Sequence, residues 1–282
     1  MDRYAVVGHP VAHSLSPRIH AAFAAATGED LSYEAVEAPR DGFVATVERL
    51  FATGFSGCNV TVPFKAEARA FAAQVDPLAA RAGAANTLRR EPDGSIAAFN
   101  TDGAGLVRDL QVNLGIPLAG ARVVMLGAGG AAAGVVESLL DAGVAELLVG
   151  NRSPERAEAL ARRFAALGAV RAVPLAALAD ADLLLNATAA SLGGERPDLA
   201  PGLVRPHTRV YDMMYGPAAG PFLDHCAALG AAAVHDGLGM LVEQAAEAFA
   251  LWRGPRPETA AVLATLRAEV APDPRTLHRE TP

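Results

Sequence analysis

Short apolar runs alternate with amphipathic stretches along the first hundred residues of the chain. Apolar residues at every second position predict strands, whereas apolar residues three or four positions apart predict helices. These patterns predict helices at residues 17–26 and 42–52, strands at 4–8, 32–38 and 57–62, and a hairpin of strands 87–90 and 95–99. Strands that alternate with helices are typical of a mainly parallel sheet.

The same alternation continues after a helix that is capped by Thr101 or Asp102 and ends near residue 113. Further strands are predicted at 122–126, 146–149, 170–173, 183–186, 209–211 and 232–235. Two helices, 238–252 and 257–268, follow without another strand, and a frayed tail begins near residue 270. We therefore expect an α/β protein of two α/β domains, in which residues 102–237 form a Rossmann-type nucleotide-binding unit.

Composition narrows the class of protein. The chain has 282 residues, of which 51% are hydrophobic, so it can bury the cores of two domains. A net charge of -7 argues against nucleic-acid binding, which calls for basic surface. We expect neither a secretory signal nor a membrane-spanning helix. Cys58 and Cys226 lack metal-binding or redox spacing, so we expect reduced thiols and a cytoplasmic protein.

A lysine and an aspartate follow two of the predicted strands. The strand at 57–62 stops at Pro63, which cannot donate a hydrogen bond to a sheet, and the loop beyond it carries Lys65. Asp102 follows the strand at 95–99. A lysine and an aspartate that meet at strand ends can handle a proton. An isolated lysine is more commonly an inert solvated charge, so this role depends on the surrounding motif.

A glycine turn follows the strand at 122–126 and leads into a helix at 131–140. In this context the small residues match the dinucleotide-binding fingerprint: one glycine permits the tight turn and another lets backbone amides approach a pyrophosphate. We expect the cofactor phosphates to be held by Gly127, Ala128, Gly129, Gly130 and Ala131.

The choice of nucleotide depends on the end of the next strand. An acidic residue there favours NAD, because it bonds the ribose hydroxyls and repels a 2′-phosphate. This chain has no acid at that point; it has Asn151, Arg152 and, one helical turn later, Arg156. We therefore predict NADP(H), with both guanidinium groups on the phosphate. The alternative is that the arginines only solvate the start of a helix capped by Ser153.

Seven segments together resemble the shikimate dehydrogenase family, which includes shikimate and quinate dehydrogenases. They lie in the family's order at 8–17, 59–65, 83–87, 100–103, 127–131, 151–153 and 236–246, and the resemblance runs from about residue 3 to about 270. It implies an NADP-dependent oxidoreductase that reversibly reduces 3-dehydroshikimate to shikimate in the biosynthesis of chorismate and aromatic amino acids. It also implies that the last helices return to the first domain, so that residues 1–101 and 238–282 form one substrate-binding, catalytic domain.

The resemblance also assigns residues. The family's catalytic pair matches Lys65 and Asp102, although which one carries the proton stays open. Ser14 and Ser16 precede a helix N-terminus, where hydroxyls and the helix dipole can hold a carboxylate, and the family uses both positions for the substrate carboxylate. Ser16 is also a candidate N-cap, with Pro17 at the first helical position.

Other contacts rest on the resemblance alone. It implies substrate contacts for Thr61, Asn86, Tyr215 and Gln244. It implies cofactor contacts for Thr188, Met213 and Gly237. Without it, Asn86 would be interpreted as a turn residue, Gln244 as an ordinary helix residue and Met213 as core.

Several alternatives remain. His9, His13 and His20 are close in sequence, but His9 and His13 flank a proline loop and no acidic or thiol partner lies nearby in sequence, so we expect no metal site. Ala189 and Ala190 replace a serine-rich turn of the family, which leaves the cofactor loop and acceptance of quinate open. A paralogue acting on quinate or an amino analogue is one rival, and an NADP-binding sensor without catalysis is another. The sequence is compatible with a monomer or a homodimer.

Overall fold

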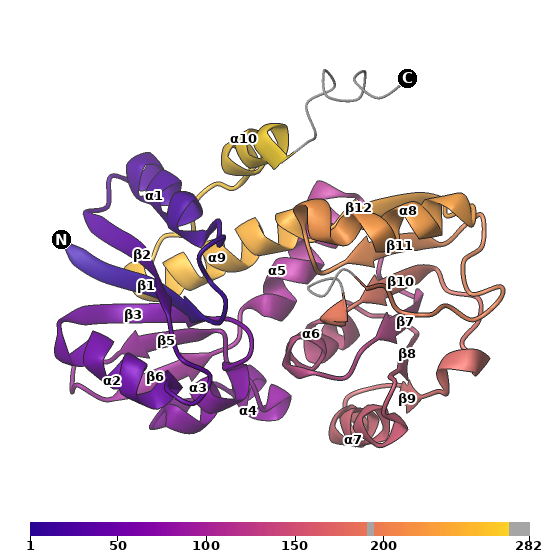
Figure 1. The fold of residues 1–282 in the computed structure, drawn as a ribbon, viewed down its shortest axis with the longest axis horizontal. Helices are drawn as coiled ribbons and strands as arrows, with labels where there is room; N and C mark the ends of the chain where they lie inside the picture. The colour runs from indigo at the N-terminus through magenta and orange to yellow at the C-terminus, as the bar shows by residue number, and fades with distance from the viewer. Residues whose placement is uncertain (191–194, 271–282) are drawn as a thin grey trace, which may run out of the picture.

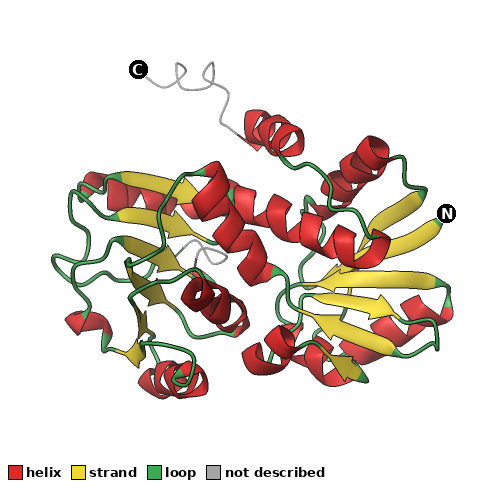
Figure 2. Cartoon of the chain, turned by 180° about the vertical axis from the view of Figure 1, so that it is seen from behind, coloured by secondary structure: helices red, strands yellow, loops and turns green. Residues whose placement is uncertain are grey.

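The computed structural model describes residues 1–190 and 195–270. It confirms the predicted α/β fold class: in this part of the chain two six-stranded sheets lie side by side, with helices against their faces (Figures 1 and 2). The strands are β1 Asp2–Gly8, β2 Leu31–Glu37, β3 Phe55–Val60, β4 Gln74–Val75, β5 Thr87–Arg90, β6 Ile96–Phe99, β7 Arg122–Leu126, β8 Glu146–Gly150, β9 Val170–Ala172, β10 Leu183–Asn186, β11 Arg209–Asp212 and β12 Ala233–Asp236. The α-helices are α1 Ser16–Thr27, α2 Phe43–Ala52, α3 Lys65–Phe71, α4 Pro77–Ala82, α5 Asp102–Arg108, α6 Gly130–Asp141, α7 Pro154–Phe164, α8 Gly220–Ala228, α9 Leu238–Arg253 and α10 Ala260–Val270.

The two sheets differ in topology. The first has the order β2-β1-β3-β5-β6-β4, with β2, β1 and β3 parallel and the β5–β6 hairpin antiparallel. The second has the order β12-β11-β10-β7-β8-β9 and is parallel throughout. Its strand order reverses between β10 and β7. Ligands of open α/β sheets bind at such a switch point, beyond the carboxyl ends of the strands.

Strand β7 shows why the second sheet forms. Val123 and Met125 belong to the core on one face, and Val124 and Leu126 belong to the core on the other. A strand covered on both faces is apolar at every position, which is the pattern of a buried parallel sheet.

Helix α9 runs back to the first sheet (Figure 1). Its apolar residues pack with Ile19 and Phe23 of α1. Trp252 near its end stacks on Tyr4 of β1 with ring centroids 4.5 Å apart, and its Nε1 donates to the Leu88 carbonyl at 3.1 Å. The segment that follows the second sheet therefore lies against the first.

Glycines allow α5 to lie closely between two other helices. A Cβ added to Gly103 would lie 2.9 Å from the Gly134 carbonyl oxygen of α6. One added to Gly105 would lie 2.6 Å from Gln244 Cβ of α9. Because any larger side chain would push these helices apart, the two glycines set the position of α5, whose first residue is Asp102.

The structure corrects three predicted boundaries. The predicted N-cap Ser16 is wrong: Ser16 already has a place in α1, the N-cap is Leu15, and no side chain caps the helix. Strand β3 ends at Val60 and not at Val62, because the Phe64 N–H closes a turn on the Thr61 carbonyl at 3.0 Å. The predicted helix at 102–113 divides into α5 and a π-helical turn, Asp109–Asn113.

His20 lies fully buried in the aromatic core that α1 shares with β2 and α9. Its ring stacks on Tyr33 with centroids 4.1 Å apart, and within the described part of the chain neither ring nitrogen is hydrogen-bonded. Burial lowers the pKa of His20 to about 3. The folded protein therefore holds this imidazole neutral at pH values where an unfolded chain would protonate it.

Replacing His20 with phenylalanine is expected to reduce the acid sensitivity of the fold. Below about pH 6.5 the unfolded state binds a proton that the folded state refuses, so the free energy of unfolding falls by about 1.4 kcal/mol per pH unit until about pH 3. When the pH falls from about 7 to about 5, the free energy of unfolding of the wild type should fall by about 2 kcal/mol more than that of His20→Phe. Urea unfolding at both pH values measures this difference. Equal losses in the two proteins would contradict the neutral buried imidazole.

Candidate active site

Lys65 is the first residue of α3. The prediction that it lies in a loop is wrong. The preceding residue, Phe64, is fully buried and stacks on Phe43 with ring centroids 5.1 Å apart, which anchors the turn. The Lys65 side chain is 15% exposed, and its Nζ lies 2.5 Å from Asp102 Oδ2. The lysine and the aspartate thus form an ion pair.

Asp102 is held by its neighbours at the start of α5. Its backbone N–H donates to Asn100 Oδ1 at 3.1 Å, and Asn100 Nδ2 donates to the Ala84 carbonyl at 2.9 Å. Helix α6 covers this carboxylate closely, because a Cβ on Gly134 would lie 3.2 Å from Asp102 Oδ2. The carboxylate is buried and can turn little.

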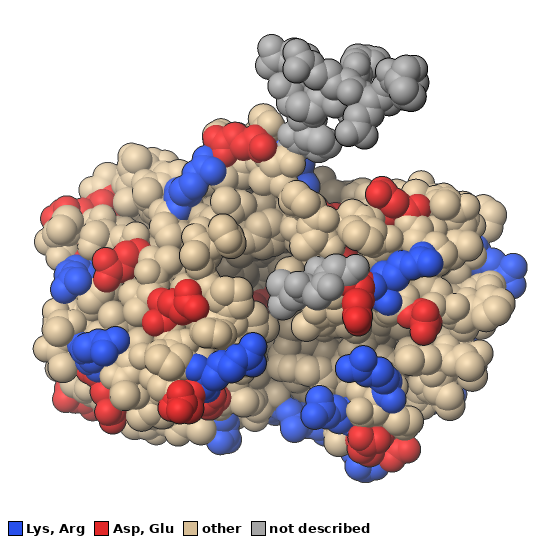
Figure 3. Space-filling view, in the orientation of Figure 1, with Lys and Arg blue, Asp and Glu red and all other residues tan. Residues whose placement is uncertain are grey.

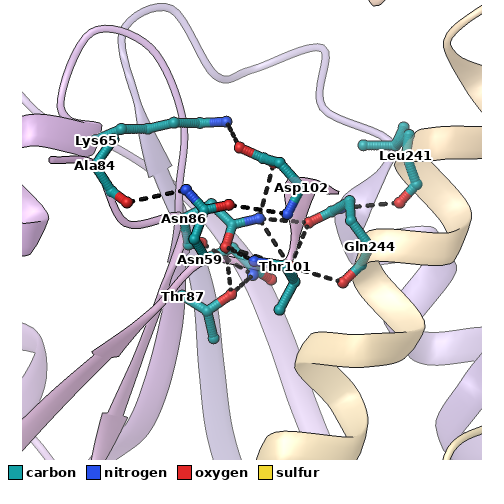
Figure 4. Close-up of polar contacts among 10 residues, drawn as sticks. Asn59, Lys65, Ala84, Asn86, Thr87, Thr101, Asp102, Leu241 and Gln244 are labelled. Atoms are coloured by element: carbon teal, nitrogen blue, oxygen red, sulfur yellow. Dashed lines mark hydrogen bonds and ion pairs between the residues drawn. The ribbon is translucent and has the colours of Figure 1, made fainter. Parts of the chain in front are cut away.

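Asn86 joins the elements of the site (Figure 4). Its Nδ2 lies within donating distance of three acceptors: Thr101 Oγ1 at 2.8 Å, Asp102 Oδ1 at 2.9 Å and Gln244 Oε1 at 3.1 Å. Its Oδ1 accepts from the Thr101 N–H at 2.9 Å. One amide thus links the end of the hairpin, the start of α5 and the middle of α9.

Gln244 reaches this group from α9, although 158 positions separate it from Asn86. Its Nε2 donates to the Leu241 carbonyl at 2.9 Å, which leaves Oε1 directed at Asn86. Thr101 Oγ1 donates to the Gln244 backbone carbonyl at 3.1 Å. The structure therefore brings Lys65, Asp102, Asn86 and Gln244 into one cluster.

The predicted carboxylate-binding residues lie around the start of α1. Ser14 Oγ accepts from the Ser16 N–H at 3.3 Å. Tyr215 packs beside Leu15, and burial raises the pKa of its phenol, so it remains a neutral donor. Thr61 lies in the turn between β3 and α3, where its methyl group faces Gly8. Two serines and one tyrosine thus surround a helix N-terminus, which favours an anion.

The glycine turn has the conformation expected for a phosphate loop. Gly127 has φ +108°, and its N–H donates to the Gly150 carbonyl at 2.8 Å. A Cβ on Gly129 would meet no atom within 4 Å, so the backbone there faces open space. Gly130 begins α6, and a Cβ on it would lie 3.8 Å from Lys65 Cβ. Ala128 and Ala131 stand on either side of Gly129 and Gly130. The N-terminus of α6 thus adjoins Lys65.

The two arginines predicted for the 2′-phosphate lie at the start of α7. Asn151 Nδ2 donates to the Ser153 carbonyl at 2.9 Å, which orders the turn. Ser153 occupies the N-cap position as expected, without a side-chain cap bond. Arg152 and Arg156 are exposed, and neither guanidinium has an ion-pair partner among residues 1–190 and 195–270. Both charges are therefore available to an anion.

Three further predicted cofactor residues gather beyond the ends of neighbouring strands. Thr188 donates through its N–H and its Oγ1 to Asn186 Oδ1, at 3.1 and 2.8 Å. The Met213 N–H donates to the Asn186 carbonyl at 2.9 Å. A Cβ on Gly237 would lie 2.7 Å from the Met213 carbonyl carbon. Thr188 also adjoins Gly127, whose Cβ would lie 3.2 Å from its nitrogen.

Sequence reasoning gave no role in the site to several buried polar residues of this cluster, although it named Thr101 as a candidate helix N-cap, which the structure confirms. They are Asn59, Thr87, Asn100 and Thr101. A signal for two of them was present, since Asn59 and Asn100 stand beside apolar strand residues in the motifs of Lys65 and Asp102. A buried amide needs hydrogen-bond partners, so these positions pointed to a polar network.

The described residues were also compared with the requirements of a metal site and of a membrane-spanning helix. No group of three or more His, Cys, Asp or Glu side chains there could hold a metal ion, and no helix there is both long and apolar enough to cross a membrane. His9 Nδ1 instead lies 3.1 Å from the Ala38 carbonyl oxygen and 3.2 Å from Glu37 Oε1.

Comparison with known families agrees with this geometry. Residues 6–88 match the shikimate dehydrogenase substrate binding domain, residues 110–193 match shikimate / quinate 5-dehydrogenase, and residues 237–267 match the shikimate 5'-dehydrogenase C-terminal domain.

Individual relatives match over nearly the whole chain. Shikimate dehydrogenase (NADP(+)) of Thioalkalivibrio sulfidiphilus is 55% identical over 269 residues, which cover 95% of this chain and 98% of the relative. That of Methylibium petroleiphilum is 56% identical over 281 residues and 95% of each chain. The crystal structure of shikimate 5-dehydrogenase from Thermus thermophilus in complex with NADP(H) and shikimate is 39% identical, with a TM-score of 0.84 over 95% of this chain and 99% of that one. The resemblance predicted from the motifs is confirmed, and the chain belongs to the shikimate dehydrogenase family.

Proposed function

We propose that the protein is an NADP-dependent oxidoreductase that interconverts 3-dehydroshikimate and shikimate, working as a reductase in the biosynthesis of aromatic precursors. The observation that carries this proposal is the 2.5 Å contact between Lys65 and Asp102, next to the N-terminus of α6. Curated relatives more than 50% identical are NADP-dependent shikimate dehydrogenases. The surface is hollowed between the two sheets, which leaves room for two ligands to meet (Figure 3).

The ion pair suits the reduction of a ketone. Such a reaction needs a hydride at carbon and a proton at the developing alkoxide. Bound NADP(H) supplies or accepts the hydride. The Lys65 ammonium attracts the carbonyl oxygen, and the Lys65–Asp102 pair delivers the proton that completes the hydroxyl. Asp102 holds the ammonium in place and accepts a hydrogen bond from a substrate hydroxyl.

Substrate recognition follows from the surrounding polar groups. The hydroxyls of Ser14, Ser16 and Tyr215 bind the substrate carboxylate at the N-terminus of α1. Thr61, Asn86 and Gln244 bind its hydroxyl groups. The helix dipole favours the anion, while the amides read the positions of neutral oxygens.

The residues around the second sheet fit NADP(H). The open backbone at Gly129 and the N-terminus of α6 suit a pyrophosphate, and Arg152 with Arg156 suits the 2′-phosphate. Thr188, Met213 and Gly237 lie at the switch point, where the nicotinamide half would pass. In this account residues 102–237 form the NADP-binding domain, and residues 1–101 with 238–282 form the substrate-binding domain. We further propose a cytoplasmic monomer or homodimer.

Replacing both Arg152 and Arg156 with alanine is expected to lower kcat/KM for NADP by about a hundredfold. Each guanidinium loses a charge-assisted contact with the phosphate, which corresponds to about tenfold per arginine. The value for NAD should stay within about twofold, because NAD lacks that phosphate. Steady-state kinetics with each cofactor checks both numbers.

Arg162→Ala is the matched control, because Arg162 lies on the same helix and pairs with Glu158. An equal loss with NAD and NADP in the double variant would show that the arginines support the fold and do not select the cofactor.

The substrate is tested by measuring kcat/KM for shikimate and for quinate, each with NADP and with NAD. The proposal expects shikimate with NADP to give the highest value. A higher value with quinate would assign the chain to the quinate-oxidising branch of the family. Binding of NADP without turnover of either substrate would favour a sensor.

A further inference from the structure

A line of polar side chains continues beneath the Asn86–Asp102 contact, away from Lys65 (Figure 4). The Tyr33 hydroxyl donates to Asn59 Oδ1 at 2.8 Å. Asn59 Nδ2 donates to Thr87 Oγ1 at 3.0 Å, and Thr87 Oγ1 donates to Asn86 Oδ1 at 3.0 Å. Thr87 is fully buried, and Asn59 is 5% exposed. These two side chains lie beyond Asn86 in the line of hydrogen bonds that leads away from Lys65.

Each hydrogen bond in this line is donated in the same direction, from Tyr33 toward Asn86. A hydroxyl has one proton, and an amide has a donor end and an acceptor end. Because burial raises the pKa of Tyr33 well above its usual value, its phenol stays a donor and holds the Asn59 oxygen. The Asn59 amino group then faces Thr87, so the Thr87 proton must point to Asn86 Oδ1. The amino group of Asn86 is left facing Asp102.

The two acceptor positions of Asn86 Oδ1 have different partners. The Thr101 N–H excludes a flipped amide, whereas the Thr87 hydroxyl at 3.0 Å limits rotation of the amide about its Cβ–Cγ bond. Thr101 Oγ1 is a third neighbour at 3.2 Å, but its proton goes to the Gln244 carbonyl. That rotation matters because Nδ2 is shared among three acceptors, one of them the carboxylate of Asp102.

The fold alone does not require the Thr87 hydroxyl. Its hydrogen bonds go to the side chains of Asn59 and Asn86, and none goes to the backbone within the described residues. Valine has the same shape, suits a buried strand position and would avoid the cost of burying a hydroxyl. A polar residue here is thus explained by the amide that it orients.

We propose that Thr87 and Asn59 are positioning residues of the reaction: they hold the donor face of Asn86 toward Asp102 and so keep the Asp102 carboxylate directed at Lys65. The His20 ring, stacked on Tyr33, fixes the far end of the line. This inference rests on the proposed function, because it concerns the speed of the hydride and proton transfer at the same site.

The test compares Thr87→Val with Thr87→Ser, using shikimate and NADP. The valine variant should show kcat lowered about tenfold, an unchanged KM for NADP, and a larger primary isotope effect with shikimate deuterated at the carbon that loses hydride. The serine variant keeps the hydroxyl and should stay within about twofold of the wild type. Thr46→Val, a buried threonine of α2, is the control for loss of a buried hydroxyl.

A purely structural role gives a different result, since a smaller folded fraction lowers the apparent kcat but leaves the isotope effect unchanged. A valine variant with the wild-type isotope effect, or a serine variant as slow as valine, would overturn the inference. If Thr87→Val does not fold, Tyr33→Phe provides the test. A raised isotope effect in that variant supports the positioning role of the line, and a wild-type isotope effect overturns it. A wild type that does not turn over shikimate would overturn the proposed function instead, and this inference with it.

Discussion

Replacing Lys65 with alanine is expected to lower kcat for shikimate oxidation by about a thousandfold. The change removes both the cation that stabilises the developing alkoxide and the side chain through which the proton moves, and acid–base groups alone contribute on this scale. NADP binding should be retained, because the phosphate contacts lie on the second sheet. Steady-state kinetics, with NADP affinity measured by fluorescence titration, checks both expectations.

Arg69→Ala provides the matched control, since Arg69 is an exposed cation on the same helix, α3. A Lys65→Ala variant that keeps more than about a tenth of the wild-type kcat would contradict a catalytic role for the lysine.

Lys65→Arg separates charge from proton transfer, because a guanidinium keeps the positive charge but does not release its proton. If Lys65 carries the proton, arginine restores only the stabilising charge and stays far below the wild type. If Asp102 carries it, arginine recovers much of the lost rate.

Replacing Asp102 with asparagine is expected to lower kcat by about a hundredfold or more. One carboxylate oxygen faces Lys65 Nζ at 2.5 Å and the other faces Asn86 Nδ2 at 2.9 Å, so both partners are donors. In either orientation, the amide of an asparagine turns its own donor toward one of these two groups. The ammonium loses its counter-charge, and the polar cluster loses its fixed geometry.

The same kinetic assay measures this effect, with Asp41→Asn as an exposed carboxylate control. Activity of Asp102→Asn within about tenfold of the wild type would show that the carboxylate is not needed to hold the lysine or to move the proton.

Local pattern was enough to predict much of the fold. The strands of the second sheet are largely apolar, and β7 runs directly into the turn at Gly127, so both were recognisable. The segment between Lys65 and Asn86 was not predicted as helix, although it forms α3 and α4. These helices have seven and six residues, and alanines blur their apolar faces; packing against the sheets stabilises such short helices more than propensity does.

The site was less accessible to pattern reasoning, because its contacts join distant segments. That Lys65 and Asp102 meet follows from strand ends that share one edge of a sheet. The contact between Asn86 and Gln244 depends on α9 returning to the first sheet, which Trp252 secures by stacking on Tyr4. No periodicity encodes such a return, and the family resemblance supplied it. The direction of the hydrogen bonds through Thr87 required coordinates.

We propose that this site oxidises shikimate to 3-dehydroshikimate with NADP and reduces that ketone with NADPH. The most direct test follows absorbance at the reduced nicotinamide band after purified protein is mixed with shikimate and NADP. We expect NADP to be reduced at a rate proportional to the protein concentration, and added 3-dehydroshikimate to reverse the signal. No absorbance change, from protein that still binds NADP, would contradict it.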